Sequence, residues 1–294
     1  MVLFGLLSPL GRLSSRPDFR RNPVRAVLKR VWWRLRWRLR TDPWLLKLPA
    51  GPGIYVARTG AGALIYYQGH SEPTVARLLK RLLGPGSVFV DVGAHLGEYA
   101  LLAAAAVGPA GEVHAFEPNP ALAQLIRRSV KLNGFGNVSL YPWAVGDADG
   151  EAALKLMPEA SLSYIAADGN DAAGVRVRCV RLDTWAAGRD RLPHVIKVDV
   201  EGAEPLVFRG AEGLLSLPSG EAPALVFEHH GAAWGRFGRT PADVWAQLSG
   251  CGYRIFGIGA AGEPVRLDPW EFSSGPATFI KNLLAVKGSP QGLW

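Results

Sequence analysis

Acidic side chains stand at the ends of three successive apolar runs, and they are the residues of this chain best placed to bind a ligand. Asp91, Glu117 and Asp147 each lie at or just after the end of a run that predicts a buried strand. Ligands of open α/β sheets bind at the carboxyl ends of the strands. There the carboxylates can accept hydrogen bonds from an ammonium group, ribose hydroxyls and an adenine amino group, each worth about 1.5–3 kcal/mol. This set fits S-adenosylmethionine, a cationic molecule, and does not fit a cofactor that carries a pyrophosphate.

A glycine turn follows the first of these strands, in the string VFVDVGAHLGEYA. Gly93 lets the backbone approach a ligand closely, and Gly97 precedes a helix whose first amides are unpaired. The dinucleotide fingerprint Gly-x-Gly-x-x-Gly is not met because position 95 is His, so a nicotinamide oxidoreductase is disfavoured. The alternative explanation of this motif is a tight turn that only packs the helix on the strand. For Glu117, the alternative is that its negative charge stabilises the start of the helix that follows.

The string IKVDVEGAE places three charges at the end of a further apolar strand. Alternation puts Lys197, Asp199 and Glu201 on one face while the chain stays extended. Our hypothesis is that Asp199 or Glu201 accepts or orients the proton of a hydroxyl, with Lys197 pairing and positioning the carboxylate. The alternative is a structural pair between Lys197 and a carboxylate that closes the strand end.

The string FEHH ends another apolar strand near the same edge. His230 or His229 is an alternative base, because histidine titrates near neutral pH. Glu228, the two histidines and Asp199 could also bind a divalent metal. Spacing alone does not fix such a site, and we predict no metal ligands. The structural alternative is that one histidine forms a hydrogen bond in the core and the other is exposed.

Strands that are apolar on both faces alternate with helices over most of the chain, which predicts a parallel sheet covered on both sides. We expect strands at 54–56, 64–67, 88–92, 113–116, 138–141, 195–198, 224–227, 253–258 and near 277–286. We expect helices at 73–83, 98–107, 120–132, near 203–215 and at 241–248. Segments 152–156 and 175–180 alternate like antiparallel strands. The loop between them carries Ser161, Ser163 and Tyr164, which could contact an acceptor or lie on a plain surface loop.

The excess of positive over negative charge lies in the first 47 residues. They carry twelve basic and two acidic side chains, while the whole chain has a net charge of +8, so the remainder sums to −2. Residues 24–40 place Val24, Leu28, Val31, Trp32, Leu35 and Leu39 on one side of a helix and basic residues on most of the rest. This pattern suits either a helix lying on an anionic membrane or one that packs its stripe on the body.

Several properties bound the location and class of the protein. We expect neither a transmembrane helix nor a signal peptide, since no run of about 18 apolar residues exists and no basic residue precedes the first apolar stretch. The two cysteines, Cys179 and Cys251, exclude a disulfide scaffold, so a reducing compartment is expected. We therefore expect a cytoplasmic protein, peripheral on the inner membrane face if residues 24–40 bind lipid.

The motifs, taken in order, resemble the FkbM-type family of class I S-adenosylmethionine-dependent methyltransferases. The resemblance covers roughly residues 85–287 and rests on VFVDVGAHLGEYALLAA, GEVHAFEPNP, LNGFGNVSLYPWAVGD, RLDTW, IKVDVEGAE and NLLAVK. It implies S-adenosylmethionine as cofactor and methyl transfer to a hydroxyl, commonly on a sugar or a polyketide. The chain departs from the family at His95, where Asn is usual.

The resemblance and the residue chemistry together define the predicted site. The cofactor-binding residues are Asp91, Gly93, Ala94, His95, Gly97, Tyr99, Glu117, Pro118, Asn119, Ala144 and Asp147. The catalytic candidates are Lys197, Asp199, Glu201 and His230.

The predicted fold class is α/β, with a Rossmann-like, mostly parallel sheet, helices on both faces, an antiparallel last strand and a small β insertion. We divide the chain into a basic amphipathic extension (1–47), a cap of strands and helix (48–84), the methyltransferase domain (85–287) and a tail (288–294).

Two other functions compete with this one. One is a catalytically silent module that binds S-adenosylmethionine at a membrane surface. The other is a methyltransferase acting on nitrogen or nucleic acid, which is disfavoured because Asp199-Val200-Glu201-Gly202 stands where such enzymes often carry Asp/Asn-Pro-Pro-aromatic. The acceptor is expected to be a hydroxylated small molecule or a glycan, and Trp143, Trp185, Trp234 and Trp270 could stack on sugar rings or belong to the core. The oligomeric state is not readable.

Overall fold

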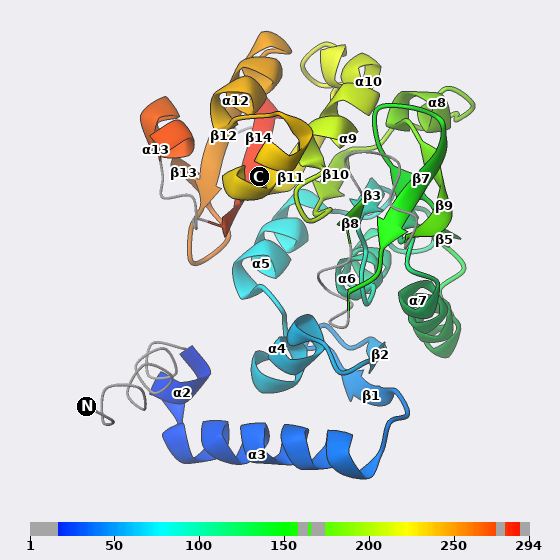
Figure 1. Ribbon diagram of the computed structural model, residues 1–294, viewed down its shortest axis with the longest axis vertical. Coiled ribbons are helices and arrows are strands. Elements are labelled where there is room, and N and C mark those ends of the chain that lie inside the picture. The colour runs from blue at the N-terminus through cyan, green and yellow to red at the C-terminus, as the bar shows by residue number, and fades with distance from the viewer. Residues whose placement is uncertain (1–16, 158–163, 166–173, 275–279, 289–294) are drawn as a thin grey trace.

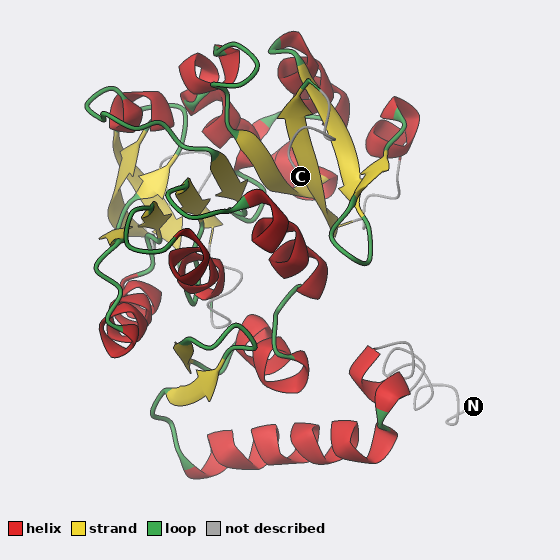
Figure 2. Cartoon of the chain, turned by 180° about the vertical axis from the view of Figure 1, so that it is seen from behind, coloured by secondary structure: helices red, strands yellow, loops and turns green. Residues whose placement is uncertain are grey.

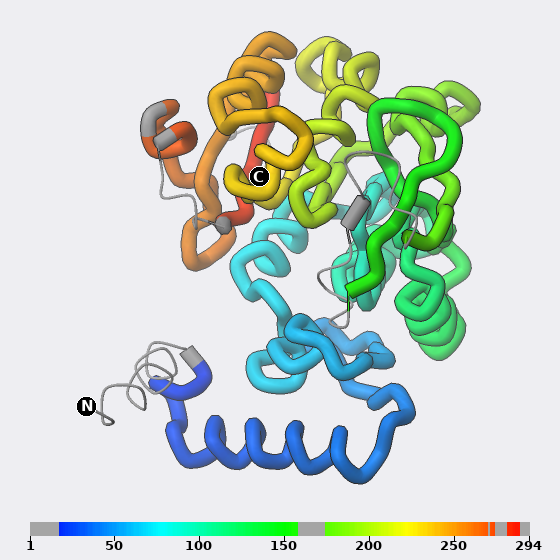
Figure 3. Tube along the Cα trace, viewed as in Figure 1, coloured from blue at the N-terminus to red at the C-terminus, as the bar shows by residue number. Residues whose placement is uncertain are grey.

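An eight-stranded sheet forms the centre of the computed structural model, which describes residues 17–157, 164, 165, 174–274 and 280–288. From one edge to the other the strands are β13 (Pro264–Arg266), β12 (Tyr253–Ile258), β14 (Ile280–Lys287), β11 (Ala224–His230), β10 (Val195–Val198), β3 (Val88–Val92), β4 (Glu112–Phe116) and β5 (Val138–Tyr141). The strands from β11 to β5 run parallel, and the C-terminal strand β14 enters antiparallel between β11 and β12 (Figure 3). This confirms the predicted fold class.

The register of the central strands decides which charges meet. Lys197 of β10 lies directly beside Asp91 of β3, and every residue of these two strands is buried. Strands buried on both faces read as continuous apolar runs, which is why the sequence predicts them well. The two charges in these runs therefore lie on adjacent strands inside the protein.

Helices cover both faces of the sheet (Figure 2). On one face pack α5 (Pro73–Leu82), α6 (Glu98–Val107) and α7 (Pro120–Asn133). On the other pack α8 (Leu182–Ala186), α9 (Glu204–Gly210), α10 (Glu212–Ser216), α11 (Gly231–Trp234), α12 (Pro241–Gly250) and α13 (Pro269–Ser274), with the short 3₁₀ turn η2 (Gly235–Phe237) after α11. The helix expected near 203–215 is interrupted at Ala211, which separates α9 from α10.

A smaller unit precedes the sheet and lies along one end of the molecule (Figure 1). It consists of α2 (Pro17–Arg21), α3 (Pro23–Leu39), the hairpin of β1 (Trp44–Lys47) and β2 (Gly53–Val56), and α4 (Gly60–Gln68). The hairpin is joined to α7 by hydrogen bonds from the backbone N–H of Gly53 to Asn133 (2.8 Å) and from that of Tyr55 to Ser129 (3.0 Å). These bonds fix the unit to the methyltransferase-like body.

The strand expected at 64–67 is wrong, because this segment forms α4. Thr59 caps the helix by accepting a hydrogen bond from the N–H of Gly62 (3.0 Å), and Gly69 ends it with a left-handed φ of +91°. Residues 64 to 67 are all apolar. This suits a helix that is covered on two sides, since α4 packs on α3 through one side and lines a cavity with another. Such a run carries no helical period, so periodicity cannot separate helix from strand there.

The β insertion forms a separate sheet in the order β6 (Ala144–Val145), β9 (Val175–Val180), β7 (Gly150–Lys155) and β8 (Tyr164–Ile165). The antiparallel pairing of β7 with β9 confirms the expected alternation. Ser161 and Ser163, considered above as acceptor contacts, lie outside the described residues. Tyr164 begins β8, where its backbone pairs with Lys155.

Within the described ranges, the structure has no helix with both the length and the apolar character needed to cross a bilayer.

Candidate active site

A cavity of about 390 Å³ lies at the carboxyl ends of β3, β4, β10 and β11 and is bounded on another side by α4. Its size is within the ~300–1,000 Å³ typical of small-molecule sites. Many of the predicted site residues line it together: Gly93, Ala94, His95, Tyr99, Glu117, Pro118, Ala144, Asp199 and Glu201. The structure thus brings the ends of the strands into one site, as the sequence-based argument required.

Gly93 allows the end of β3 to lie against the end of β10. Its φ is +81°, and an added Cβ would stand 1.8 Å from the backbone oxygen of Asp199. The N–H groups of Gly93 and Ala94 both donate to the carbonyl oxygen of Phe116 at 3.0 Å, which ties the turn to β4. Gly97, with a φ of +80°, does not line the cavity and serves as the N-cap of α6.

We expect Gly93→Ala to lower the free energy of unfolding by at least about 2 kcal/mol. A left-handed alanine costs roughly 1–2 kcal/mol, and the new Cβ must also displace the backbone of β10. Urea unfolding measures this loss, and calorimetric titration with S-adenosylhomocysteine measures the accompanying loss of affinity. Gly84→Ala is the matched control, because its Cβ would meet no atom within 4 Å. Equal stability and affinity of Gly93→Ala and wild type would contradict this role.

Glu117 presents a nearly buried carboxylate to the cavity. One oxygen accepts from the backbone N–H of His95 (2.7 Å) and the other from that of Asn119 (2.8 Å). Burial, only partly opposed by these bonds, raises the pKa of Glu117 to about 8. A carboxylate has about four lone-pair sites, so capacity remains for two ligand hydroxyls. Asn119 itself does not line the cavity and caps α7 by accepting from Ala121 (3.0 Å).

Lys197, Asp91 and Asp199 form a group of charges at the base of the site, in which Lys197 and Asp91 are buried and the side chain of Asp199 is 28% exposed. The Nζ of Lys197, which is 1% exposed, donates to Asp199 at 2.8 Å and lies 4.8 Å from the ring centroid of Tyr99. Asp91 is fully buried and does not line the cavity, and neither of its carboxylate oxygens has a hydrogen-bond partner among the described residues. Burial raises the pKa of Asp91 to about 6 against the opposing effect of Lys197.

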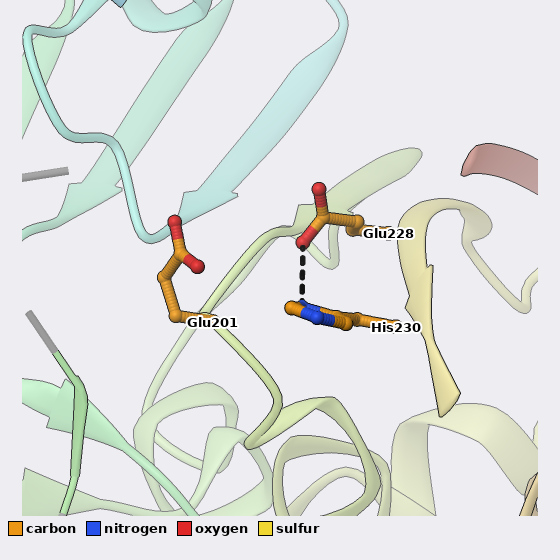
Figure 4. Close-up of side chains that lie close together, drawn as sticks. All are labelled: Glu201, Glu228 and His230. Atoms are coloured by element: carbon orange, nitrogen blue, oxygen red, sulfur yellow. Dashed lines mark ion pairs between the residues drawn. The ribbon is translucent and has the colours of Figure 1, made fainter. Parts of the chain in front are cut away.

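Glu201, Glu228 and His230 converge beside the cavity (Figure 4). Glu201 has a left-handed φ of +54°, rare for a residue other than glycine, and its carbonyl accepts from Arg236. Burial raises the pKa of Glu201 to about 8 and that of Glu228 to about 10, with Asp199 and Glu204 adding to both shifts. Burial and Arg236 lower the pKa of His230, so its imidazole is neutral at neutral pH.

These three side chains are also the residues that could hold a metal ion. One ligand atom of each lies within 4.8 Å of the others, and carboxylate oxygens with an imidazole nitrogen suit several divalent cations. The group differs from the one considered from the sequence, since Glu201 belongs to it and His229 and Asp199 do not. His229 points into the core, where its Nε2 lies 3.0 Å from the carbonyl oxygen of Phe272.

Asp147 lies apart from the cavity. Its carboxylate forms an ion pair with Arg209 and does not belong to the cavity lining. Its contact with an adenine amino group therefore stays a prediction without support from this arrangement. Of the tryptophans, Trp143 lines the cavity, Trp185 and Trp234 are buried in the core, and the side chain of Trp270 lies outside the described residues.

The loop between α4 and α5 contributes site residues that the sequence reasoning missed. Ser71 and Glu72 of this loop line the cavity together with Glu98, the first residue of α6. The carboxylate of Glu98 accepts a hydrogen bond from Ser71 Oγ (2.6 Å) and lies 2.8 Å from Nδ1 of His70. Burial and the negative charge of Asp199 raise the pKa of Glu72 to about 7. The polar run from position 69 to 72 was the available signal, but it follows no strand end and so predicted nothing.

A pH dependence follows from this surplus of carboxyl groups. The pKa of Asp91 is raised to about 6, and the pKa values of Glu117 and Glu201 are raised to about 8. Near pH 6 these groups therefore carry protons in the free protein. A bound cation favours their ionised forms, so we expect the affinity for S-adenosylmethionine to rise from pH 6 to pH 8, by up to about tenfold per pH unit for each proton released.

Titration calorimetry across this range, in buffers of different ionisation enthalpy, measures both the affinity and the protons released. S-adenosylhomocysteine is the matched control because its sulfur is uncharged, and its affinity should change less with pH. Equal slopes for the two molecules would contradict the expectation. The free energy of unfolding of the free protein should change with pH in the opposite direction. Carboxyl groups with raised pKa values stabilise the folded free protein most below about pH 4.5, and this contribution is lost as the pH rises through 8.

The strand order, with an antiparallel strand between β11 and β12, and the carboxylate-lined cavity at the strand ends define a class I methyltransferase fold. The model of the methyltransferase FkbM domain family matches residues 91–255, more than half of the chain, and the chain belongs to this family. This confirms the predicted FkbM-type family and S-adenosylmethionine as the predicted cofactor.

Solved structures show distant similarity. A putative rRNA methylase from Clostridium thermocellum is 12% identical, covers 73% of this chain and 94% of its own, and has a TM-score of 0.46. A SAM-dependent O-methyltransferase from Thermotoga maritima is 13% identical over 84% and 78% of the two chains, with a TM-score of 0.41. The fibrillarin of Aeropyrum pernix, with bound S-adenosyl-L-methionine, is 14% identical over 83% and 94%, also at 0.41. A search of curated proteins finds no match.

Proposed function

We propose that the protein is an S-adenosylmethionine-dependent O-methyltransferase that methylates a hydroxyl of a sugar, glycolipid or similar hydroxylated metabolite. The observation that carries this proposal is the gathering of Glu117, Asp199 and Glu201 around one cavity beside the Gly93 turn. The acidic lining fits a cation and disfavours a phosphate. The orphaned carboxylate of Asp91 close to Lys197 adds to the negative charge next to this cavity.

The residues of the chain have separable tasks in this proposal. When bound, S-adenosylmethionine supplies an electrophilic methyl group on a positively charged sulfur. Glu117 accepts hydrogen bonds from ribose hydroxyls, and the Gly93 turn leaves the backbone close to the ligand. Glu201 orients the acceptor hydroxyl and takes its proton, while Lys197 holds Asp199 in place as a carboxylate. Alignment of this kind is worth up to about 7–11 kcal/mol, and a general base typically adds about 10²–10⁴-fold.

Glu201 is the base that the geometry favours among the candidates. It lines the cavity, whereas His230 does not, and Asp199 is already engaged with Lys197. Its raised pKa of about 8 makes it a stronger base than an ordinary glutamate. His230 and Glu228 lie next to it and complete the surroundings of its carboxylate.

The function is tested by incubating the protein with S-adenosylmethionine labelled in its methyl group and with separate fractions of glycans, glycolipids and small hydroxylated metabolites. Mass spectrometry then locates the transferred methyl group. We expect an O-methyl product in one fraction. The Glu117→Gln variant should bind the donor more weakly, whereas Glu112→Gln, at the opposite end of the same strand, should not.

Other outcomes would assign the competing functions. A methyl group on nitrogen or on nucleic acid would overturn the O-methyltransferase proposal in favour of that chemistry. Tight binding of the donor with no transfer to any fraction would favour a module that binds S-adenosylmethionine without catalysis. Absence of measurable donor binding would contradict both.

A further inference from the structure

The long N-terminal helix α3 turns its apolar stripe away from the protein. Val24, Leu28 and Leu39 are 70%, 61% and 70% exposed, and Trp32 is 50% exposed. Val31 and Leu35 belong to the same stripe and are also exposed. The side of the helix that packs on the body instead consists of Ala26, Trp33 and Trp37.

The buried side of α3 is well anchored, so the exposed stripe is not the result of a loosely attached helix. Trp33 stacks on Tyr66 of α4 with ring centroids 5.8 Å apart and packs against Trp44 at 6.0 Å. Lys29 donates to the carbonyl oxygens of Tyr66 (3.0 Å) and Tyr67 (2.9 Å). Aromatic packing therefore takes the place that the apolar stripe would occupy in an ordinary surface helix.

Arginines border the stripe on both sides. At 100° per residue, Arg25 lies along one border and Arg34 and Arg38 lie along the other, and all three are exposed. An apolar strip between cationic borders matches the chemistry of an anionic bilayer, in which acyl chains lie behind negatively charged headgroups.

We propose that α3 docks the protein in the plane of an anionic membrane, with the stripe of Val24, Leu28, Val31, Trp32, Leu35 and Leu39 in the acyl boundary and the bordering arginines among the headgroups. The helix lies on the surface and does not span it. This inference does not depend on the methyl-transfer chemistry, because it uses no residue of the site.

The position of α4 connects the docked face with the site. One side of α4 packs on α3 through Tyr66, and Gly60, Ala61, Leu64 and Ile65 of the same helix line the cavity. Figure 1 shows α4 between α3 and the sheet. Docking through α3 therefore leaves α3 and α4 between the bilayer and the site, and it puts the bilayer on the side of the cavity that α4 bounds.

Co-sedimentation of the full chain with vesicles tests the proposal. We expect binding to mixed phosphatidylglycerol–phosphatidylcholine vesicles, weaker binding to pure phosphatidylcholine, and weakening by salt. The stripe variant Leu28→Ser/Trp32→Ser should lower the partition coefficient at least about tenfold. The border variant Arg34→Gln/Arg38→Gln should lower it about fivefold per arginine, for the anionic vesicles only.

Val265→Ser is the matched control, since Val265 is 47% exposed on β13 and belongs to neither α3 nor α4. It should bind vesicles as the wild type does. Donor affinity, measured for every variant, shows that the fold is intact. Failure of the wild type to bind anionic vesicles, or wild-type binding by the stripe variant, would overturn the proposal. So would a dimer in analytical ultracentrifugation that the stripe variant loses while vesicle binding is absent, because the stripe would then bind a second copy.

Discussion

Glu201→Gln is expected to lower kcat by about 10²–10⁴-fold while the dissociation constant of S-adenosylhomocysteine stays nearly unchanged. The side chain faces the cavity from a left-handed backbone position that costs energy to maintain, and such positions cluster at functional sites. Glutamine preserves the shape and the hydrogen-bonding reach of the side chain but cannot take a proton. The loss should therefore appear in turnover, while the affinity for the uncharged S-adenosylhomocysteine stays intact.

The pH profile distinguishes a base from a residue that only positions the acceptor. In the wild type, kcat/KM should rise toward pH 8, because this ratio reports the free enzyme, in which the pKa of Glu201 is about 8. The Gln variant should lose the part of that rise that comes from Glu201 and keep the part that comes from Asp91 and Glu117. Glu221→Gln, an exposed glutamate away from the cavity, is the control.

Two results would contradict this assignment. Full turnover in both Glu201→Gln and Asp199→Asn would show that neither carboxylate acts on the hydroxyl. Loss of wild-type turnover on treatment with EDTA, restored by a divalent cation, would instead assign Glu201, Glu228 and His230 to a metal ion.

The central strands and the first half of the site could be predicted because local sequence decides them. A strand such as Val88–Val92 is apolar at almost every position, so a buried parallel strand is the simplest structure for it, and the polar residues that follow must then lie at one edge of the sheet. Glu117 and Gly93 were found in this way. The same reasoning leaves Asp147 a prediction, because a residue several positions beyond a strand end can turn toward another helix, here to Arg209 of α9.

The remaining features depend on contacts between distant segments. The run Leu64 to Tyr67 forms a helix because it has α3 on one side and the cavity on the other, and neither neighbour is visible in the run itself. Which side of α3 faces the protein also depends on contacts with distant segments. Its sequence shows an apolar stripe and two further tryptophans, and only the aromatic groups of Trp44 and Tyr66 decide that Trp33 faces inward. Glu72 reaches the cavity through the folding of the loop between α4 and α5, and no strand pattern in the sequence predicts the position of this loop.

The largest effect on stability is expected for Lys197→Met, which should lower the free energy of unfolding by about 3–5 kcal/mol at pH 8. Lys197 is the cation of the group of charges at the base of the site, and Met has a similar length without the charge. Burial alone would lower the pKa of Lys197, yet the carboxylates of Asp199 and Asp91 outweigh burial and hold it above its usual value. Removing the ammonium group leaves both carboxylates without that compensation.

The sign of the pH dependence separates this electrostatic effect from a simple packing loss. Lys197 opposes the rise in the pKa of Asp91, so without Lys197 this pKa should rise further, and protonation of Asp91 at lower pH relieves its repulsion with Asp199. The destabilisation of Lys197→Met relative to wild type should therefore be smaller at pH 5 than at pH 8, as measured by urea unfolding at both values. A packing defect would cost the same at each pH.

A double-mutant cycle completes the test. Lys197→Met combined with Asp199→Asn removes one of the stranded charges, and it should be less destabilised than the sum of the two single variants, because paired groups in contact are not additive. Lys80→Met, an exposed lysine on α5, should change stability by less than about 0.5 kcal/mol. Additive single variants, or a Lys197→Met protein as stable as wild type at pH 8, would show that this group is not held together by charge.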